Sequence, residues 1–271
     1  MPTIDVNGAT LYYEQRGDGP PLVFISGAGG DAGYWTEAAE ALADEYTVLT
    51  YDRRANSRSP RPPDWDAAPI DEQSDDTAAL LSALGLAPAI AYGNSLGAEI
   101  AINVALRHPE VLRAVVAHEP PFLGVTSAAG SVGPALESLV TNAMNRGGPP
   151  LAMEEFCRWV AGDAVYESFD PVLRQRLLDN GAVFFALEMS GAMSYLPSAD
   201  DLARVAIPRV AACGVDNSDP ASDKHWFCEA AQWLAERWDS PLVHLPGGHV
   251  PQASHPEDFV AELRPLLTKL A

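Results

Sequence analysis

The chain has 271 residues, of which 47% are hydrophobic and 20% are charged. This composition suits one large globular domain, with or without an insertion, and argues against a disordered or fibrous chain. The formal net charge of −20 and the pI near 4.5 disfavour nucleic acids and anionic membranes as partners. The same negative field favours a neutral substrate over an anionic one.

The sequence has no basic segment followed by an apolar run at its start, and no stretch of membrane-spanning length. We therefore expect a cytoplasmic protein with no membrane partner. Its three cysteines, Cys157, Cys213 and Cys228, are unclustered and lack metal-ligand spacing, which predicts buried thiols rather than a disulfide framework or a zinc site. No cofactor is expected.

The first half of the chain alternates strand and helix patterns. Residues 4–16 alternate around Asn7-Gly8, which predicts a hairpin. The apolar run 22–25 has the character of a buried strand. A helix is predicted over about 33–45 and a further strand over 46–51. This order favours an α/β domain.

A glycine-rich loop, Ser26 to Gly30, follows the buried strand. Such a loop can hold a phosphate or supply amides to an oxyanion. The dinucleotide pattern G-x-G-x-x-G and the Walker lysine are both absent here, so the oxyanion role is favoured. The amide of Ala28, helped by Gly27, and the amide of Leu96 are the expected donors.

The segment 89–101 reads as an apolar strand, the turn Gly93-Asn94-Ser95-Leu96-Gly97 and the start of a helix. A G-x-S-x-G sequence in this context predicts a nucleophile elbow, a sharp turn that exposes the serine hydroxyl. The helix that begins after Ser95 adds partial positive charge where an oxyanion would form. Ser95 is therefore the candidate nucleophile.

Three arginines, Arg53, Arg54 and Arg58, lie in the loop that follows the strand 46–51. They could clamp an anionic substrate or hold a loop beside the site through ion pairs and hydrogen bonds. We predict the structural role.

The base and the acid of a catalytic triad are expected after later strands. Glu119 lies two residues after a predicted strand over 112–117, one strand beyond the elbow, and Asp216 follows the strand 208–214. Either carboxylate is placed to orient a histidine. His249 lies on the glycine-rich loop after the last strand, and its ring can reach the edge of the sheet.

Between Glu119 and the later strands, residues 122–204 have helical periodicity, which predicts a cap over the site. The core domain then comprises residues 1–121 and 205–271. Aromatic and methionine side chains of the cap can line an apolar pocket or form the cap's own core. The candidate substrate-binding residues are Asn94, Phe122, Trp159, Phe184, Phe185, Met189, Tyr195 and Val250.

With a glycine-rich loop, an elbow serine, a downstream acid and His249 in this order, the whole chain resembles the α/β-hydrolase superfamily. The resemblance implies a mostly parallel central sheet flanked by helices, with an inserted helical cap. The segments His118-Glu119-Pro120, Leu245 to Pro251 and Ser254-His255-Pro256 look like those of zearalenone lactonases. In that branch the acid maps to Glu119, and on this resemblance Glu119 is preferred to Asp216.

The expected activity is that of a serine hydrolase acting on a hydrophobic ester or lactone, including a macrolactone, through Ser95, His249 and Glu119. Other reactions of the superfamily remain open: hydrolysis of carbon–carbon bonds, lyase chemistry, and cyclisation or release of polyketides. A non-catalytic ligand-binding protein is a further alternative, against which the intact set of catalytic residues argues. The chain could be a monomer or a homodimer.

Overall fold

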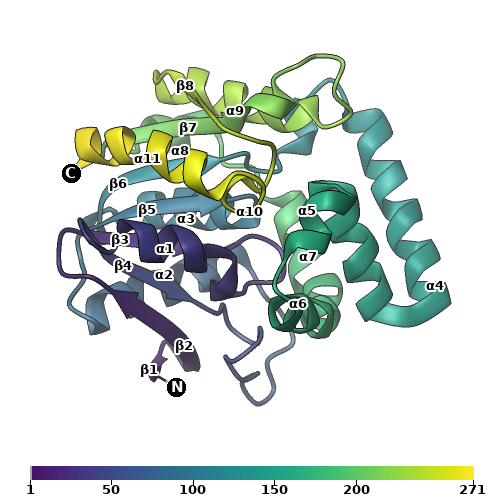
Figure 1. Ribbon diagram of the computed structural model, residues 1–271, viewed down its shortest axis with the longest axis horizontal. Helices are drawn as coiled ribbons and strands as arrows, with labels where there is room; N and C mark the ends of the chain where they lie inside the picture. Colours follow the sequence, from purple (N-terminus) through teal and green to yellow (C-terminus); the bar gives the residue numbers. More distant parts are fainter. Residues whose placement is uncertain (1) are drawn as a thin grey trace.

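A computed structural model describes residues 2–271, and in this range eight strands form one sheet (Figure 1). The strand order is β1-β2-β4-β3-β5-β6-β7-β8. The strands are β1 (Thr3–Val6), β2 (Ala9–Arg16), β3 (Pro21–Ile25), β4 (Thr47–Tyr51), β5 (Ala89–Asn94), β6 (Leu112–His118), β7 (Arg209–Gly214) and β8 (Leu242–Leu245).

Antiparallel pairing is confined to one edge of the sheet, where β1 pairs with β2 and β2 with β4. Asn7 and Gly8 both have positive φ, as a two-residue hairpin turn requires. All pairings from β4 through β3 to β8 are parallel. Parallel strands bring their carboxyl ends to one edge of the sheet, so the loops that follow β3, β5, β6 and β8 gather there.

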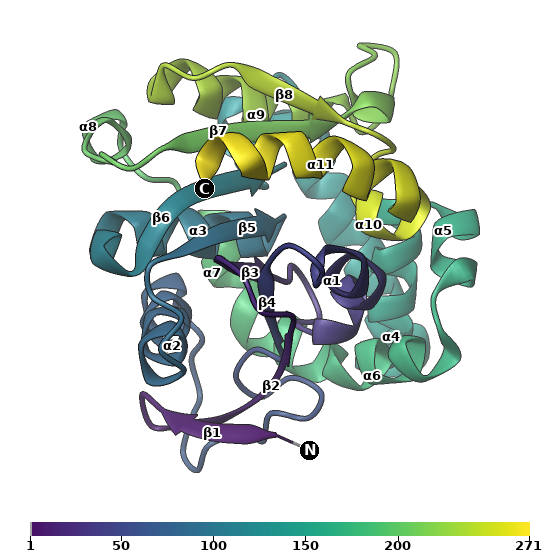
Figure 2. The same ribbon diagram turned by 60° about the vertical axis from the view of Figure 1, so that its left-hand side comes forward.

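Helices cover both faces of the sheet (Figure 2). One face carries α1 (Thr36–Leu42) and α11 (Pro256–Leu270), and their buried side chains form one core with the sheet. The opposite face carries α2 (Ile70–Ala83), α3 (Leu96–Arg107) and α9 (His225–Trp238), whose side chains contribute to a second core. The predicted α/β-hydrolase architecture is therefore confirmed.

Most of the helical segment between β6 and β7 lies beyond the carboxyl edge of the sheet (Figure 1), but its last helix lies near the opposite end of β7 (Figure 2). We call residues 122–204 the cap. Its longest helix, α4, has non-helical backbone at Gly148 directly before two prolines, which bends it there. The cap contains η3 (Leu123–Val125), α4 (Ala129–Ala161), α5 (Asp163–Ser168), α6 (Pro171–Val183), the π-helical η4 (Phe184–Glu188), α7 (Met189–Ser194) and α8 (Ala199–Ala203).

Short elements complete the connections near the site. They are η1 (Ala32–Trp35), η2 (Pro109–Val111), η5 (Val215–Asn217) and α10 (Pro251–Ser254). Across residues 2–271, no helix combines the length and the apolar character needed to cross a membrane.

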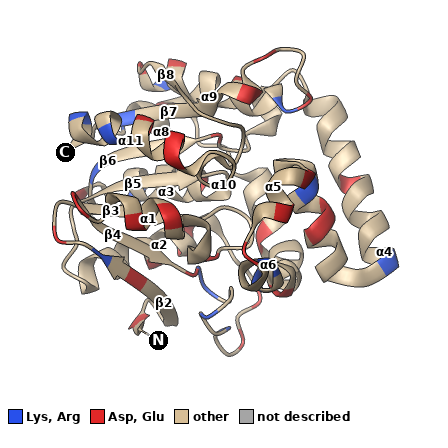
Figure 3. Cartoon of the chain, in the orientation of Figure 1, with Lys and Arg blue, Asp and Glu red and all other residues tan. Residues whose placement is uncertain are grey.

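Acidic residues are spread over the sheet domain and the cap (Figure 3). The arginines that follow β4 are paired with some of them below the surface. Arg53 pairs with Glu188 of the cap at 2.6 Å, and Arg54 pairs with Asp76 of α2 at 2.6 Å. Arg58 pairs at 2.7 Å with the buried carboxylate of Asp52, the first residue of the same loop. The structural role predicted for these arginines is confirmed.

Candidate active site

Ser95 stands at the turn between β5 and α3. Its backbone has φ 57° and ψ −127°, a strained conformation for a side chain other than glycine and one that is common at functional sites. The turn closes tightly, because a Cβ added to Gly97 would lie 2.0 Å from the carbonyl oxygen of Ile25. This tight turn directs the Ser95 side chain into the pocket between the sheet edge and the cap.

Glu119 and His249 are in direct contact. Nδ1 of His249 lies 2.7 Å from Oε2 of Glu119, and both side chains are buried. Glu119 follows β6 with φ 49°, so the second candidate catalytic residue is also held in a left-handed conformation. The structure therefore brings together two residues that are 130 positions apart in the sequence.

Three further hydrogen bonds hold the Glu119 carboxylate. The Gly214 amide donates to Oε1 at 2.8 Å, and the Asn217 Nδ2 group donates to Oε1 at 2.9 Å and to Oε2 at 3.0 Å. Sequence reasoning missed Asn217, although it lies next to the alternative acid Asp216. Asp216 itself is exposed, and within residues 2–271 no hydrogen bond joins its carboxylate to His249.

The electrostatics of the pair favour a charged Glu119. Burial alone raises the pKa of its carboxyl, but the hydrogen bond from His249, the neighbouring His118 and the Gly214 amide lower it by more. The pKa of Glu119 therefore lies below its ordinary value, and the carboxylate is ionised at neutral pH. An ionised acid accepts a hydrogen bond from Nδ1–H, which fixes one histidine tautomer.

His118, next to Glu119, is fully buried, and burial lowers its pKa to about 4. An unfolded histidine binds its proton near pH 6.5, so between these values the unfolded chain holds more protons and stability falls as the pH falls. We expect the free energy of unfolding to fall by about 2 kcal/mol from pH 7 to pH 5 because of His118. Denaturant unfolding of the parent and of His118→Phe at both pH values measures this, and an equal loss in both proteins would contradict it.

The His249 ring is fixed on its other sides as well. The Phe227 ring of α9 stacks on it with centroids 3.8 Å apart and an interplanar angle of 21°. The Asn94 side chain donates to the His249 carbonyl oxygen at 2.8 Å. Because Nδ1 is engaged by Glu119, Nε2 is the ring nitrogen available to Ser95. In residues 2–271 no hydrogen bond yet joins Ser95 and His249, and such contacts commonly tighten when substrate binds.

The predicted oxyanion loop packs directly on the elbow. A Cβ added to Gly27 would lie 2.9 Å from the Asn94 carbonyl oxygen and 2.9 Å from the Ser95 Cβ, so only glycine fits there. The amides of Ala28 and Leu96 donate no hydrogen bond to another group within the described residues. Two free amides beside a strained serine can together bind a developing negative charge.

The pocket around Ser95 has two lobes, and Ala28, Ser95, Phe156, Val160 and His249 line both. The first lobe encloses about 490 Å³, including space open to solvent, and the second about 460 Å³. The first is also lined by Tyr34, Asn94, Cys157, Phe169, Val250 and Gln252. The second is also lined by Leu96, Leu136, Trp159, Phe184, Met189, Trp226 and Phe227.

Five of the predicted substrate-binding residues thus line the pocket, and three do not. Phe122 instead packs on Tyr195 and Trp233. Phe185 packs on Phe156 and Phe184, and the Tyr195 hydroxyl donates to Asn103 on α3 at 3.3 Å. Phe122 and Tyr195 thus join the cap to the core, and Phe185 packs within the cap. Helical periodicity does not separate these roles from pocket lining.

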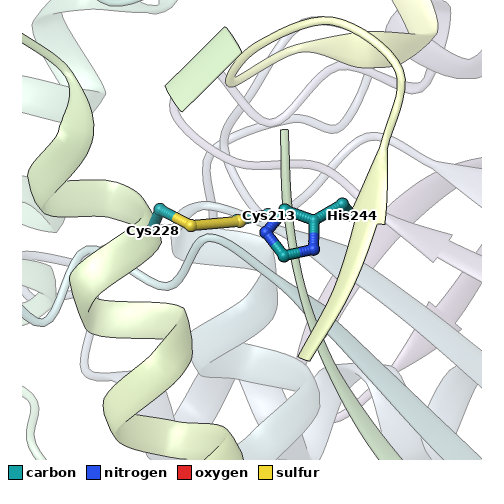
Figure 4. Close-up of side chains that lie close together, drawn as sticks. All are labelled: Cys213, Cys228 and His244. Atoms are coloured by element: carbon teal, nitrogen blue, oxygen red, sulfur yellow. A yellow bond between two sulfur atoms is a disulfide. The ribbon is translucent and has the colours of Figure 1, made fainter. Parts of the chain in front are cut away.

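One group of side chains in the described residues has the geometry of metal ligands, Cys213 of β7, Cys228 of α9 and His244 of β8 (Figure 4). The two cysteines form a disulfide with Cα atoms 5.3 Å apart, so the expectation of free buried thiols is wrong for this pair. The pairing arises because α9 packs on β7, which spacing in the sequence does not reveal. Disulfide sulfurs are not thiolates, so this donor set does not suit a metal in this state.

The chain belongs to the alpha/beta hydrolase fold family, which it matches over residues 20–182. It is 30% identical to the uncharacterized hydrolase YraK of Bacillus subtilis, over 98% of this chain and 96% of that protein. The family and this relative define a hydrolase.

Solved structures share the fold. A thermophilic esterase from Thermogutta terrifontis superposes with a TM-score of 0.79 at 21% identity, covering 100% of this chain and 99% of that one. The enol-lactonase of Burkholderia xenovorans gives a TM-score of 0.72 at 20% identity, covering 98% of this chain and 100% of that one.

Proposed function

We propose that this hydrolase cleaves a carboxylic ester or a lactone by acyl transfer to Ser95. The observation that carries the proposal is the buried Glu119–His249 contact at 2.7 Å beside a serine in strained elbow geometry. This set of groups matches the chemical requirements of a nucleophile, a base and an acid that orients the base.

In the first step, Nε2 of His249 takes the proton of the Ser95 hydroxyl as its oxygen attacks the substrate carbonyl. The amides of Ala28 and Leu96 stabilise the tetrahedral oxyanion. Glu119 holds the tautomer that leaves Nε2 free to accept the proton, and it stabilises the resulting imidazolium. His249 then donates this proton to the departing alcohol oxygen, which leaves an acyl-enzyme.

In the second step, His249 removes a proton from water as the water oxygen attacks the acyl carbonyl. His249 then returns this proton to the Ser95 oxygen as the bond between Ser95 and the acyl group breaks, which releases the acid and restores the free enzyme. For a lactone, the alcohol and the acid are parts of one product. In this reaction scheme, Ser95, His249 and Glu119 carry out the proton transfers and hold the charge on the imidazolium, so the scheme requires no cofactor.

The lining of the pocket favours a neutral, hydrophobic substrate. The second lobe is almost wholly apolar, and Trp159, Phe184 and Met189 supply much of its surface. An esterase and an enol-lactonase share this fold, and both names describe the hydrolysis of an ester linkage. We infer that at least one side of the scissile ester carries an alkyl or aryl group that fills this lobe.

Met189 tests the use of the second lobe. We expect Met189→Gln to lower kcat/KM for long-chain esters by about 10-fold, because a polar amide must then be desolvated against an apolar chain. Short-chain esters that do not reach the lobe should be affected less than about two-fold. Val172→Gln is the matched control, since Val172 is a cap residue that is 62% exposed and lies outside the pocket. Equal losses with short and long chains would argue against the assignment.

The activity is tested by incubation with a fluorophosphonate probe, followed by peptide mass spectrometry and by turnover of an ester and lactone panel. We expect a covalent adduct on Ser95, formed as the serine oxygen displaces fluoride from phosphorus, together with hydrolysis of at least one apolar ester or lactone. A folded protein that neither acquires the adduct nor hydrolyses the panel would refute the proposal.

A further inference from the structure

The guanidinium of Arg53 lies beneath the oxyanion loop. The residue follows β4, and only 1% of it is exposed. Its Nε donates to the Ser26 carbonyl oxygen at 3.1 Å, and its Nη2 donates to the Gly27 carbonyl oxygen at 2.8 Å. Its backbone amide also donates to the Gly30 carbonyl oxygen at 2.8 Å. One residue thus binds three backbone carbonyl oxygens of this loop.

These bonds determine where the Ala28 amide points. The Gly27 carbonyl and the Ala28 N–H belong to one planar trans peptide unit, in which the two groups point in opposite directions. The Gly27 carbonyl accepts from Arg53 at 2.8 Å and from the Gly30 amide at 3.1 Å, and neither donor residue lines the two lobes of the pocket. The Ala28 N–H, on the opposite side of the same peptide, is therefore directed toward the pocket that Ala28 and Ser95 line. A rotation of this peptide would turn the amide away from the oxyanion.

The cap, in turn, holds the guanidinium. Glu188 of η4 accepts from Nη1 of Arg53 at 2.6 Å and from Nη2 at 2.9 Å, and it is as deeply buried as its partner. Asn56 donates to the same carboxylate at 2.9 Å. Glu188 closes a π-helical segment, a distortion that is frequent at functional sites. A bidentate pair fixes the plane of the guanidinium, which a single contact does not.

We infer that Arg53 is a positioning residue of the oxyanion hole, and that Glu188 of the cap sets its orientation. The inference rests on the proposed function, since it assigns Arg53 a part in stabilising the oxyanion that forms when Ser95 attacks the substrate. It predicts that losing Arg53 weakens the binding of the transition state more than the binding of the substrate. If Arg53 merely joined the cap to the core, its loss would lower the stability of the protein. The binding of the transition state relative to that of the substrate would not change.

The test uses a double variant, Arg53→Met with Glu188→Met, which removes the donors without leaving an unpaired buried charge. A second variant, Arg53→Lys, keeps a cation opposite Glu188 but does not reach both loop carbonyls in the same geometry. The matched control is Arg54→Met with Asp76→Met. Arg54, from the same loop as Arg53, forms a buried bidentate pair with Asp76 of α2 at 2.6 and 2.8 Å, and within residues 2–271 neither side chain makes a hydrogen bond to the oxyanion loop.

Each folded variant is titrated with the fluorophosphonate to give the concentration of active sites, and kcat is expressed per active site. We expect kcat per site to fall by about 10- to 100-fold in both Arg53 variants, with KM changed by less than about two-fold. The inhibition constant of an apolar trifluoromethyl ketone, which forms an oxyanion on Ser95, should rise by the same factor. The control pair should keep the parent values.

Two results would overturn the inference. If the parent hydrolyses esters and either folded Arg53 variant matches the control in kcat and in ketone affinity, the positioning role is wrong and the hydrolase proposal stands. If the parent shows neither labelling nor turnover, both the hydrolase proposal and the positioning role fall.

Discussion

Ser95→Ala is expected to lower kcat by about 10⁴-fold or more, while the protein stays folded. The change removes the oxygen that forms the acyl bond in the proposed scheme. The Cβ is retained, so the strained elbow, its contact with Gly27 and the close approach of Gly97 to Ile25 should persist. Turnover of the best ester from the panel and the thermal midpoint are the two measurements.

The matched control for this change is Ser168→Ala, which removes an exposed cap hydroxyl that donates only to the carbonyl oxygen of Val165. It should leave kcat within about two-fold of the parent, as is usual for a surface substitution remote from the chemistry. Ser95→Ala protein that retains a tenth or more of the parent kcat would remove Ser95 from the role of nucleophile.

The sequence predicts much of this fold because local patterns and tertiary structure agree. Apolar runs give the strands of the parallel sheet, and glycine-rich segments follow β3 and β8 at its carboxyl edge. Ser95 and His249 are identifiable for the same reason, since each lies in a glycine-rich loop directly after a predicted strand. Their local sequences already specify unusual backbone geometry.

The acid could not be chosen from local pattern alone. Glu119 and Asp216 each follow a strand, and β6 and β7 are neighbours in the sheet, so both carboxylates begin near the same place. The choice depends on backbone detail. The left-handed φ of Glu119 turns its side chain toward His249, and the 3₁₀ turn η5 directs Asn217 inward while Asp216 faces solvent.

Contacts between distant segments account for what the sequence did not predict. The Phe227–His249 stack and the Cys213–Cys228 bond both depend on the packing of α9 against β7. Arg53 and Glu188 are 135 positions apart, and their pairing requires the cap to be seated on the core. Helical periodicity indicates that a cap side chain is buried, but it does not indicate whether the neighbour is the pocket or the core.

Glu119→Gln separates the two candidate acids. The glutamine oxygen can still accept from Gly214 and Asn217, so the fold should be retained. Its amide, however, would donate to Nδ1 of His249 and place the imidazole proton on Nε2, where it blocks acceptance of the Ser95 proton. We expect kcat to fall by about 10⁴-fold, the size of the effect when the acid of a serine triad becomes an amide.

Asp216→Asn is the matched control, because it makes the same chemical change at an exposed carboxylate in the neighbouring loop. It should leave kcat within about two-fold of the parent, as is typical of a surface change. A large loss in Asp216→Asn with little loss in Glu119→Gln would transfer the triad acid to the loop after β7. The rate of fluorophosphonate labelling at Ser95 should also fall in Glu119→Gln and not in Asp216→Asn. Labelling depends on the same base, His249, but does not include the deacylation step. Agreement of the two readouts would locate the defect of Glu119→Gln in the activation of Ser95.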